Sequence, residues 1–220
     1  MGIGENVRNI LSQLPKGVDL EIAAKSREAH EIEEAIQAGA RIVGENYVQE
    51  AERVIPMVKS PAEWHFIGSV QENKINKMIR LFDMIETIGS VEMAKILDKK
   101  CQIAGKKMNI LIEVNSGREP QKSGAMPEKI EEIVKEISKL SNIKVMGLMT
   151  MGPAVEAEKL RPYFRLTKEL FDHIRDQNIE NVEMKILSMG MSDSYIVAIE
   201  EGANLVRIGT KIFGPRVYKR

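Results

Sequence analysis

The clearest indication of the fold is the stretch KILSMGMSDSYIVAIEEGANLVRIGTKIFG, residues 185–214. It holds two short apolar runs, each followed by a turn rich in Gly, Ser or Thr, with a helical pattern between them. A strand, a helix and a second strand in this order are typical of a parallel sheet. Arg207 lies inside the second apolar run. Because a buried charge is costly unless it is paired, we expect Arg207 to face a partner.

The same alternation of apolar runs and amphipathic stretches repeats along the chain. The candidate strands are LEIAA (20–24), RIVG (41–44), WHFIG (64–68), DMIET (83–87), NILIEV (109–114), KVMGLM (144–149), EMKIL (183–187) and NLVRIG (204–209). Helical patterns cover residues 30–40, 73–82, 127–140 and 160–177, and an extra helix is expected at residues 7–14. Eight strand–helix units in 220 residues predict one (β/α)8 TIM-barrel domain over residues 1–220.

An open, doubly wound sheet is the alternative architecture. It is disfavoured because the strands do not group into two nucleotide-binding halves and no GxGxxG follows the first strand.

The composition excludes several classes of function. The chain has 32 Lys and Arg and 32 Asp and Glu, so a formal net charge of zero gives no sign of nucleic-acid binding. No apolar run is long enough to span a bilayer, and no secretory signal opens the sequence. The single cysteine, Cys101, excludes an internal disulfide and a cysteine-based zinc site. We expect a cytoplasmic protein with no membrane, nucleic-acid or metal partner.

Chemistry in such barrels lies at the C-terminal ends of the strands. Lys25 follows the first strand and the small residues Ala23 and Ala24. Enclosure there would lower the pKa of its amine and make it nucleophilic toward an aldehyde. The alternative is an exposed loop lysine paired with Glu28.

The turns after the last two predicted strands, SMGMSDS and IGT, are candidates for an anion site. Backbone N–H groups and hydroxyls converge in such turns, and the last two loops of these barrels commonly bind phosphate. Ser192 and Asp193 are equally plausible as caps of the following helix. An amine, a phosphate site and a buried arginine together fit pyridoxal 5′-phosphate. A Schiff-base aldolase acting on a sugar phosphate would need the same lysine and anion site.

Specific segments then connect the chain with a known family. They are AAKSRE (23–28), GENYVQEA (44–51), WHFIGSVQENK (64–74), EVNSGREPQKSG (113–124), GLMTMG (147–152) and the region from residue 187 to residue 216. In this order they resemble the pyridoxal-phosphate-binding homeostasis proteins, the YggS/PROSC-like family. That family is related in fold to the N-terminal barrel of alanine racemase. The resemblance covers residues 20–216, and AAKSRE departs from it after the lysine.

The resemblance implies roles for individual residues. By position in the motifs, Lys25 corresponds to the Schiff-base lysine and Arg207 to the arginine at the pyridine nitrogen. The predicted cofactor-binding residues are Lys25, Asn46, Ser188, Met189, Arg207, Gly209 and Thr210. Ser188, Gly209 and Thr210 would bind the phosphate, and Asn46 and Met189 would line the ring pocket.

The resemblance also implies a function without turnover chemistry. The chain would hold pyridoxal 5′-phosphate on Lys25 and buffer it or deliver it to pyridoxal-phosphate-dependent apo-enzymes through transient contacts. The sequence shows no extra interface element, so we expect a monomer. The alternative is a weak amino-acid racemase that uses Tyr47 or a water as its second base. The sequence ends at Arg220, just after the predicted barrel, so we expect no second domain that would supply that base.

His65 and Lys122 also lie in these motifs, but the motifs alone give them no definite role. A hydrogen-bonded core histidine is the simplest interpretation of His65. Lys122 is a candidate for holding the aldehyde transiently.

Overall fold

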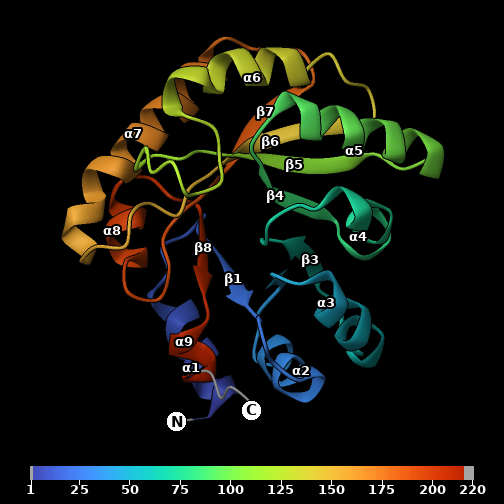
Figure 1. Ribbon diagram of the computed structural model, residues 1–220. Helices are drawn as coiled ribbons and strands as arrows, with labels where there is room; N and C mark the ends of the chain where they lie inside the picture. Colours follow the sequence, from blue (N-terminus) through green and yellow to red (C-terminus); the bar gives the residue numbers. More distant parts are fainter. Residues whose placement is uncertain (1, 216–220) are drawn as a thin grey trace.

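The chain folds into a closed barrel of eight parallel strands in the sequential order β1 to β8 (Figure 1). The computed structural model describes residues 2–215. The strands are β1 (Asp19–Ala23), β2 (Ile42–Glu45), β3 (Glu63–Phe66), β4 (Met84–Ile88), β5 (Met108–Glu113), β6 (Ile143–Met149), β7 (Val182–Ser188) and β8 (Leu205–Ile208). The predicted (β/α)8 architecture is confirmed, and each predicted strand overlaps an observed one.

Helices follow the strands and form the outer layer. The α-helices are α1 (Ile3–Gln13), α2 (Ala29–Gln37), α3 (Val48–Val54), α4 (Ile75–Leu81), α5 (Val91–Ala104), α6 (Ile130–Ile137), α7 (Ala157–Asp176), α8 (Tyr195–Glu200) and α9 (Thr210–Phe213). Short 3-10 turns are η1 (Ile55–Met57), η2 (Glu72–Lys74) and η3 (Pro127–Lys129). Among residues 2–215, no helix combines the length and the apolar character that crossing a bilayer requires.

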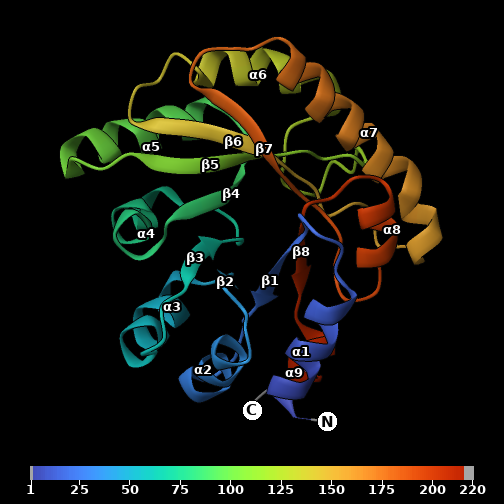
Figure 2. The ribbon, with the colours of Figure 1, turned by 180° about the vertical axis from the view of Figure 1, so that it is seen from behind.

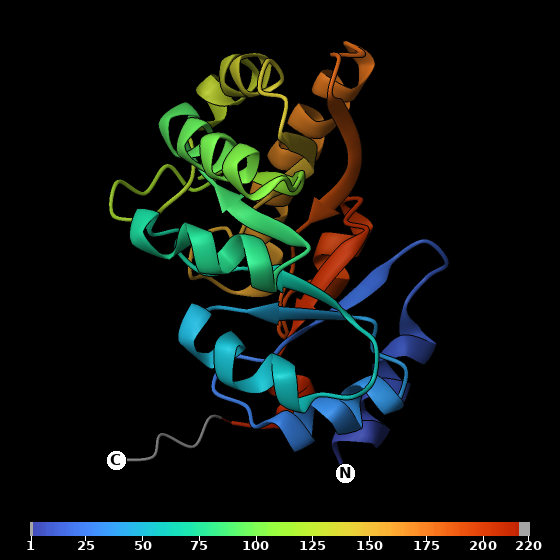
Figure 3. The ribbon, with the colours of Figure 1, turned by 90° about the vertical axis from the view of Figure 1, so that its right-hand side faces the viewer.

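The extra N-terminal helix is present and longer than predicted. It lies beside α2 and α9 at one side of the barrel (Figures 2 and 3). The Gly4 N–H donates to Glu34 Oε1 of α2 at 2.8 Å, and Asn6 Nδ2 donates to the Ile212 carbonyl of α9 at 2.9 Å. These contacts fix α1 against α2 and α9, the helices that follow β1 and β8, where the barrel closes.

Strand pairing is uneven around the barrel. β1 pairs with β8 over four residues, which places Glu21 directly opposite Arg207. In contrast, β7 pairs with β8 through a single register pair, Ser188 with Leu205. Hydrogen bonds from the flanking loops supplement this seam, including Arg207 N–H to the Gly190 carbonyl at 3.0 Å.

The apolar core lies mainly between the strands and the helices, where residues such as Phe164 of α7 and Leu97 of α5 are fully buried. A second, small apolar cluster consists of Met84, Leu111 and Met149. The barrel also buries a set of polar side chains, namely Glu21, His65, Glu86, Ser188 and Arg207. Ser188 bonds to Glu86, although β7 and β4 are not neighbouring strands. These two side chains therefore meet across the inside of the barrel.

Candidate functional site

A cavity of about 380 Å³ opens at the C-terminal ends of the strands. Its lining residues are Ala23, Lys25, Asn46, Ile67, Met149, Met151, Met191, Ser192, Asp193, Arg207, Gly209 and Thr210. They come from loops far apart in the sequence, which the parallel strand order brings to one end of the barrel. Five of the seven residues predicted from the sequence are among them. The lining of this cavity thus includes an amine, a guanidinium and two glycine- and hydroxyl-rich turns.

Lys25 is half-buried at the edge of this cavity. Its Nζ lies 4.9 Å from the centroid of the Tyr47 ring, and it takes part in no ion pair among residues 2–215. The next residue, Ser26, has φ +63°, and its N–H donates to Glu50 Oε2 of α3 at 2.8 Å. A non-glycine residue in this region is uncommon and needs support from its surroundings. The turn therefore fixes the backbone that carries the amine.

Arg27 ties the lysine loop to the C-terminal side of the cavity. Its Nη2 donates to the Gly214 carbonyl at 2.6 Å, and its guanidinium lies 5.2 Å from the centroid of the Phe213 ring. Both partners belong to the segment that follows the turn at Gly209. The two walls of the cavity are consequently linked by one buried side chain.

The turn at Gly209 and Thr210 offers free backbone donors. Among residues 2–215, neither N–H group donates a hydrogen bond. A Cβ at Gly209 would lie 3.1 Å from the Ala23 carbonyl oxygen, so the absence of a side chain allows the two loops to approach closely. The neighbouring Lys211 N–H contacts Ser192 Oγ at 3.4 Å, which joins this turn to the one after β7.

Ser192 and Asp193 do not cap α8, so the alternative interpretation of these two residues as helix caps is wrong. The N-cap of α8 is Ser194, with no side-chain capping bond to the helix, and its Oγ accepts instead from the Met191 N–H at 3.2 Å. Ser192 and Asp193 line the cavity.

Arg207 is buried, and protein groups already hold part of its guanidinium. Nη2 donates to the Thr150 carbonyl at 2.8 Å, and Nη1 donates to Ser188 Oγ. Nη1 also lies 3.9 Å from Glu86 Oε2. A guanidinium carries five N–H donors, and the side chain makes no other hydrogen bond within the described residues. Arg207 therefore has the partners expected for a buried charge, namely Ser188, Thr150 and Glu86. Other N–H groups of its guanidinium remain available to a ligand, and Arg207 lines the cavity.

Two predicted residues lie elsewhere. Ser188 is fully buried, and its hydroxyl donates to Glu86 Oε2 at 2.6 Å while accepting from Arg207. Met189 is fully buried in the apolar core. Neither side chain lines the cavity.

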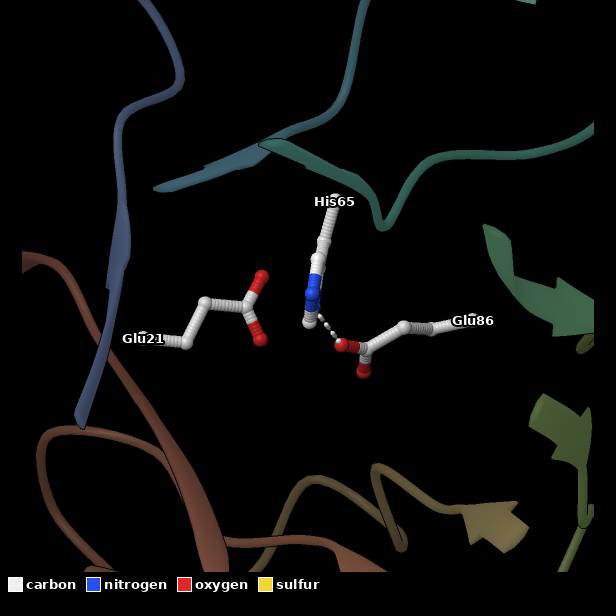
Figure 4. A group of neighbouring side chains, drawn as sticks. All are labelled: Glu21, His65 and Glu86. Atoms are coloured by element: carbon white, nitrogen blue, oxygen red, sulfur yellow. Dashed lines mark hydrogen bonds and ion pairs between the residues drawn. The ribbon is translucent and has the colours of Figure 1, made fainter. Parts of the chain in front are cut away.

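Sequence reasoning missed two buried carboxyl groups near Arg207, those of Glu21 and Glu86. Figure 4 shows them with His65 between them. Glu21 and Glu86 have no exposed surface. Burial opposes the charge of Glu86, but hydrogen bonding and the charge of His65 outweigh it and lower the pKa of Glu86. Burial and the nearby Glu86 raise the pKa of Glu21 well above its usual value. The signal was present in the sequence, because each glutamate interrupts an apolar run as Arg207 does.

His65 is a charged core residue. Nδ1 lies 2.7 Å from Glu86 Oε1, and Nε2 lies 3.1 Å from Glu63 Oε1. Burial disfavours the imidazolium, but these two carboxylates outweigh it and raise the pKa of His65 to about 10. The simplest interpretation from the sequence, a hydrogen-bonded core histidine, is confirmed.

Glu21, His65 and Glu86 place potential metal-ligand atoms within 4.8 Å of one another. A metal ligand must be a neutral imidazole, whereas both nitrogens of His65 face carboxylates that keep the ring protonated. The arrangement therefore favours a buried ion-pair network over a metal centre.

Lys122 lies in a neighbouring pocket of about 280 Å³, lined in part by Glu113 and Met151. Its Nζ donates to the Gly152 carbonyl at 3.1 Å and pairs with Glu119 Oε2 at 2.6 Å. The structure does not bring Lys122 to the wall of the main cavity.

Comparisons with known proteins agree with this geometry. The family model of the alanine racemase N-terminal domain matches residues 3–217. An alanine racemase from Clostridium difficile superposes with a TM-score of 0.83 at 17% identity, and the chain covers 57% of it. At this identity the likeness shows the fold alone.

Relatives with higher identity narrow the assignment. A pyridoxal phosphate homeostasis protein from Aquifex aeolicus is 39% identical over 219 residues, covering 99% of this chain and 91% of the relative. One from Helicobacter pylori is 38% identical over 200 residues, covering 89% and 87%. PipY from Synechococcus elongatus, solved with PLP bound, superposes with a TM-score of 0.89 at 31% identity, covering 96% and 100%. The chain belongs to the alanine racemase N-terminal domain family and, within it, to the pyridoxal phosphate homeostasis proteins.

Proposed function

We propose that the chain binds pyridoxal 5′-phosphate in the cavity at the C-terminal end of the barrel. The observation that carries this proposal is the convergence of Lys25, Arg207 and the Gly209–Thr210 turn on one cavity of about 380 Å³. The residues fit the cofactor, because within residues 2–215 the cavity holds an amine without an ion pair, guanidinium donors without acceptors and two backbone N–H groups that donate no hydrogen bond. Its relatives named for pyridoxal phosphate homeostasis, and PipY with PLP bound, support the same choice.

Each wall of the cavity would hold one part of the cofactor. Lys25 supplies the primary amine that holds the aldehyde, which is the reactive group that the cofactor brings when bound. The N–H groups of Gly209 and Thr210 would hold the phosphate. Arg207 would donate to the ring nitrogen, and Asn46 would line the ring pocket. The half-exposed Met151 and Met191 cover the apolar faces at the rim.

We further propose that the chain buffers this cofactor and delivers it to apo-enzymes. Because an arginine is always protonated, Arg207 would leave the nitrogen of a bound ring unprotonated, which would make the ring a weak electron sink. This arrangement disfavours the carbanion chemistry of most enzymes that use the cofactor. The exposed rim would let an apo-enzyme reach the cavity through a transient contact.

A weak amino-acid racemase is the second candidate, because Tyr47 lies beside Lys25. Racemisation needs a proton donor or acceptor on each face of the bound ring. Tyr47 contacts the lysine itself and follows the adjacent strand, so the two groups approach the cavity from the same side. This position supports a carrier over a racemase.

The test uses the purified protein with added pyridoxal 5′-phosphate. We expect near-visible absorbance, and borohydride reduction followed by peptide mass spectrometry should place the cofactor on Lys25. Lys25→Ala should abolish both signals, whereas the matched variant Lys122→Ala should keep them. A colourless protein that takes up no cofactor would overturn the binding proposal. Stereochemical interconversion of an amino acid, lost in Tyr47→Phe, would establish the racemase instead.

A further inference from the structure

A chain of hydrogen bonds crosses the inside of the barrel and ends at Arg207. It begins at Glu63, whose side chain is 47% exposed at the start of β3, the end of the barrel opposite the cavity. From there it continues through His65 to Glu86, whose other oxygen accepts from Ser188. Ser188 Oγ in turn accepts from Arg207 Nη1. Strands β3, β4, β7 and β8 each supply a member.

The raised pKa of His65 and the permanent charge of Arg207 favour one direction for each bond in this chain of hydrogen bonds. A protonated His65 donates from both nitrogens, so Glu86 can act only as an acceptor toward it. The second oxygen of Glu86 then draws the Ser188 proton, which turns the lone pairs of that hydroxyl toward Arg207. Arg207 is always a donor and is the last member of this series of hydrogen bonds. Its Nη2 also donates to the Thr150 carbonyl at 2.8 Å.

We propose that His65 and Glu86 are positioning residues that hold the Arg207 guanidinium in the orientation that receives the cofactor. The identity of the ligand in this inference rests on the proposed function, whereas the positioning of Arg207 rests on the hydrogen bonds described above. His65 acts by keeping Glu86 ionised, and Glu86 acts by orienting Ser188. Neither residue lines the cavity, so both act through Arg207.

The other charged groups near this chain are consistent with that role. Glu21 lies opposite Arg207 in the strand register, and within residues 2–215 neither of its carboxyl oxygens has a hydrogen-bond partner. Burial and the nearby Glu86 raise its pKa, which disfavours its charged form. Glu113 on β5 is also buried, with a pKa raised by burial, and Ser123 donates to it at 2.8 Å. Glu86 is thus the acid that compensates both buried cations, His65 and Arg207.

The first experiment measures the apo-protein, so it does not depend on cofactor binding. We expect guanidinium NMR signals of Arg207 that exchange slowly with water in the wild type. His65→Gln retains one donor and removes the charge, and it should broaden or shift those signals. The matched control is Glu52→Gln, which removes an exposed carboxylate that pairs with Lys77 outside this chain of hydrogen bonds and should leave the Arg207 signals unchanged. Unchanged Arg207 signals in folded His65→Gln protein would overturn the proposal.

The second experiment is a double-mutant cycle on the cofactor dissociation constant. We expect His65→Gln to raise this constant about tenfold, the order of one charge-assisted hydrogen bond, and to shift the absorbance of the bound cofactor. In an Arg207→Lys background the same change should have less than about a twofold effect, because residues that act through one another are not additive. Equal effects in both backgrounds would show a merely structural role. Glu86→Gln gives a second, independent cycle if His65→Gln does not fold.

Failure of the inference is distinguishable from failure of the proposed function. A wild-type protein that binds no cofactor refutes the function, while the apo-protein NMR comparison still decides whether the chain positions Arg207. A wild-type protein that binds the cofactor and tolerates His65→Gln without loss refutes the inference alone.

Discussion

Glu45 provides a test of the electrostatics of the barrel that needs no ligand. Glu45 is the last residue of β2 and is fully buried, and neither of its carboxyl oxygens has a hydrogen-bond partner in the part of the chain that the structure describes. Burial, aided by the nearby Glu50, raises its pKa from 4.5 to about 8. Between these values the folded carboxyl binds a proton that the unfolded one has released, so the free energy of unfolding falls as the pH rises. One pKa unit corresponds to about 1.4 kcal/mol, so the full shift amounts to about 5 kcal/mol.

The variant Glu45→Gln stays neutral at every pH and should lack this slope. We expect wild type and variant to have similar stability near pH 4.5, and the variant to be the more stable one near pH 9, by several kcal/mol on the linkage relation. Urea unfolding at pH values of about 5, 7 and 9 measures the difference.

Glu33→Gln is the control for this comparison. Hydrogen bonds from the Ser60 hydroxyl and the Lys59 N–H lower the pKa of Glu33 to about 2. Its contribution is present above the unfolded pKa and lost only as the pH falls toward 2, so this variant should differ from wild type by a constant amount from pH 5 to 9. Parallel profiles for wild type and Glu45→Gln would refute the reasoning, because Glu45 would then titrate alike in both states.

Two further predictions concern stability. Gly147→Ala should destabilise the fold by about 3 kcal/mol or more, because a Cβ would lie 1.8 Å from the Ile186 carbonyl oxygen and φ is +153°. Calorimetry tests this against the control Gly105→Ala. Gly105 has φ +62° and no atom near the added Cβ, so alanine should cost only about 1 kcal/mol there. Ser90→Ala should cost about 1 kcal/mol, because Ser90 Oγ accepts the Met93 N–H at the start of α5; an unchanged urea midpoint would show that this cap contributes nothing.

The strand order could be predicted because alternation of apolar runs and amphipathic helices is a local property of the sequence. The run NLVRIG, for example, predicted β8 within one residue at each end. Helix α9 was missed because four residues, Thr210–Phe213, carry too little periodicity to be recognised. The uneven pairing at β7 and β8 was also beyond prediction, since register depends on contacts between distant segments.

The candidate site could be predicted in part. Lys25, Gly209 and Thr210 follow strands directly, so the rule that loops after parallel strands converge was enough to bring them together. The depth of a side chain below the cavity does not follow from that rule. Ser188 is the last residue of β7 and looks like a loop ligand, yet it points into the barrel and bonds to Glu86. The sequence marks Glu86 as a charge within an apolar run, but which groups contact Arg207 depends on strands far apart in the sequence.

The sparse pairing between β7 and β8 has a consequence for local opening of the fold. Ser188 is the single β7 residue in register with β8, and its hydroxyl is also bonded to Arg207 across the same seam. A ligand that engages Arg207 would then tie together the two strands whose backbones hold each other least. Local opening is governed by the weakest cooperative contacts, so amide hydrogen exchange should slow most at this seam on binding. Ligand binding would therefore stabilise the barrel mainly at the contact between β7 and β8.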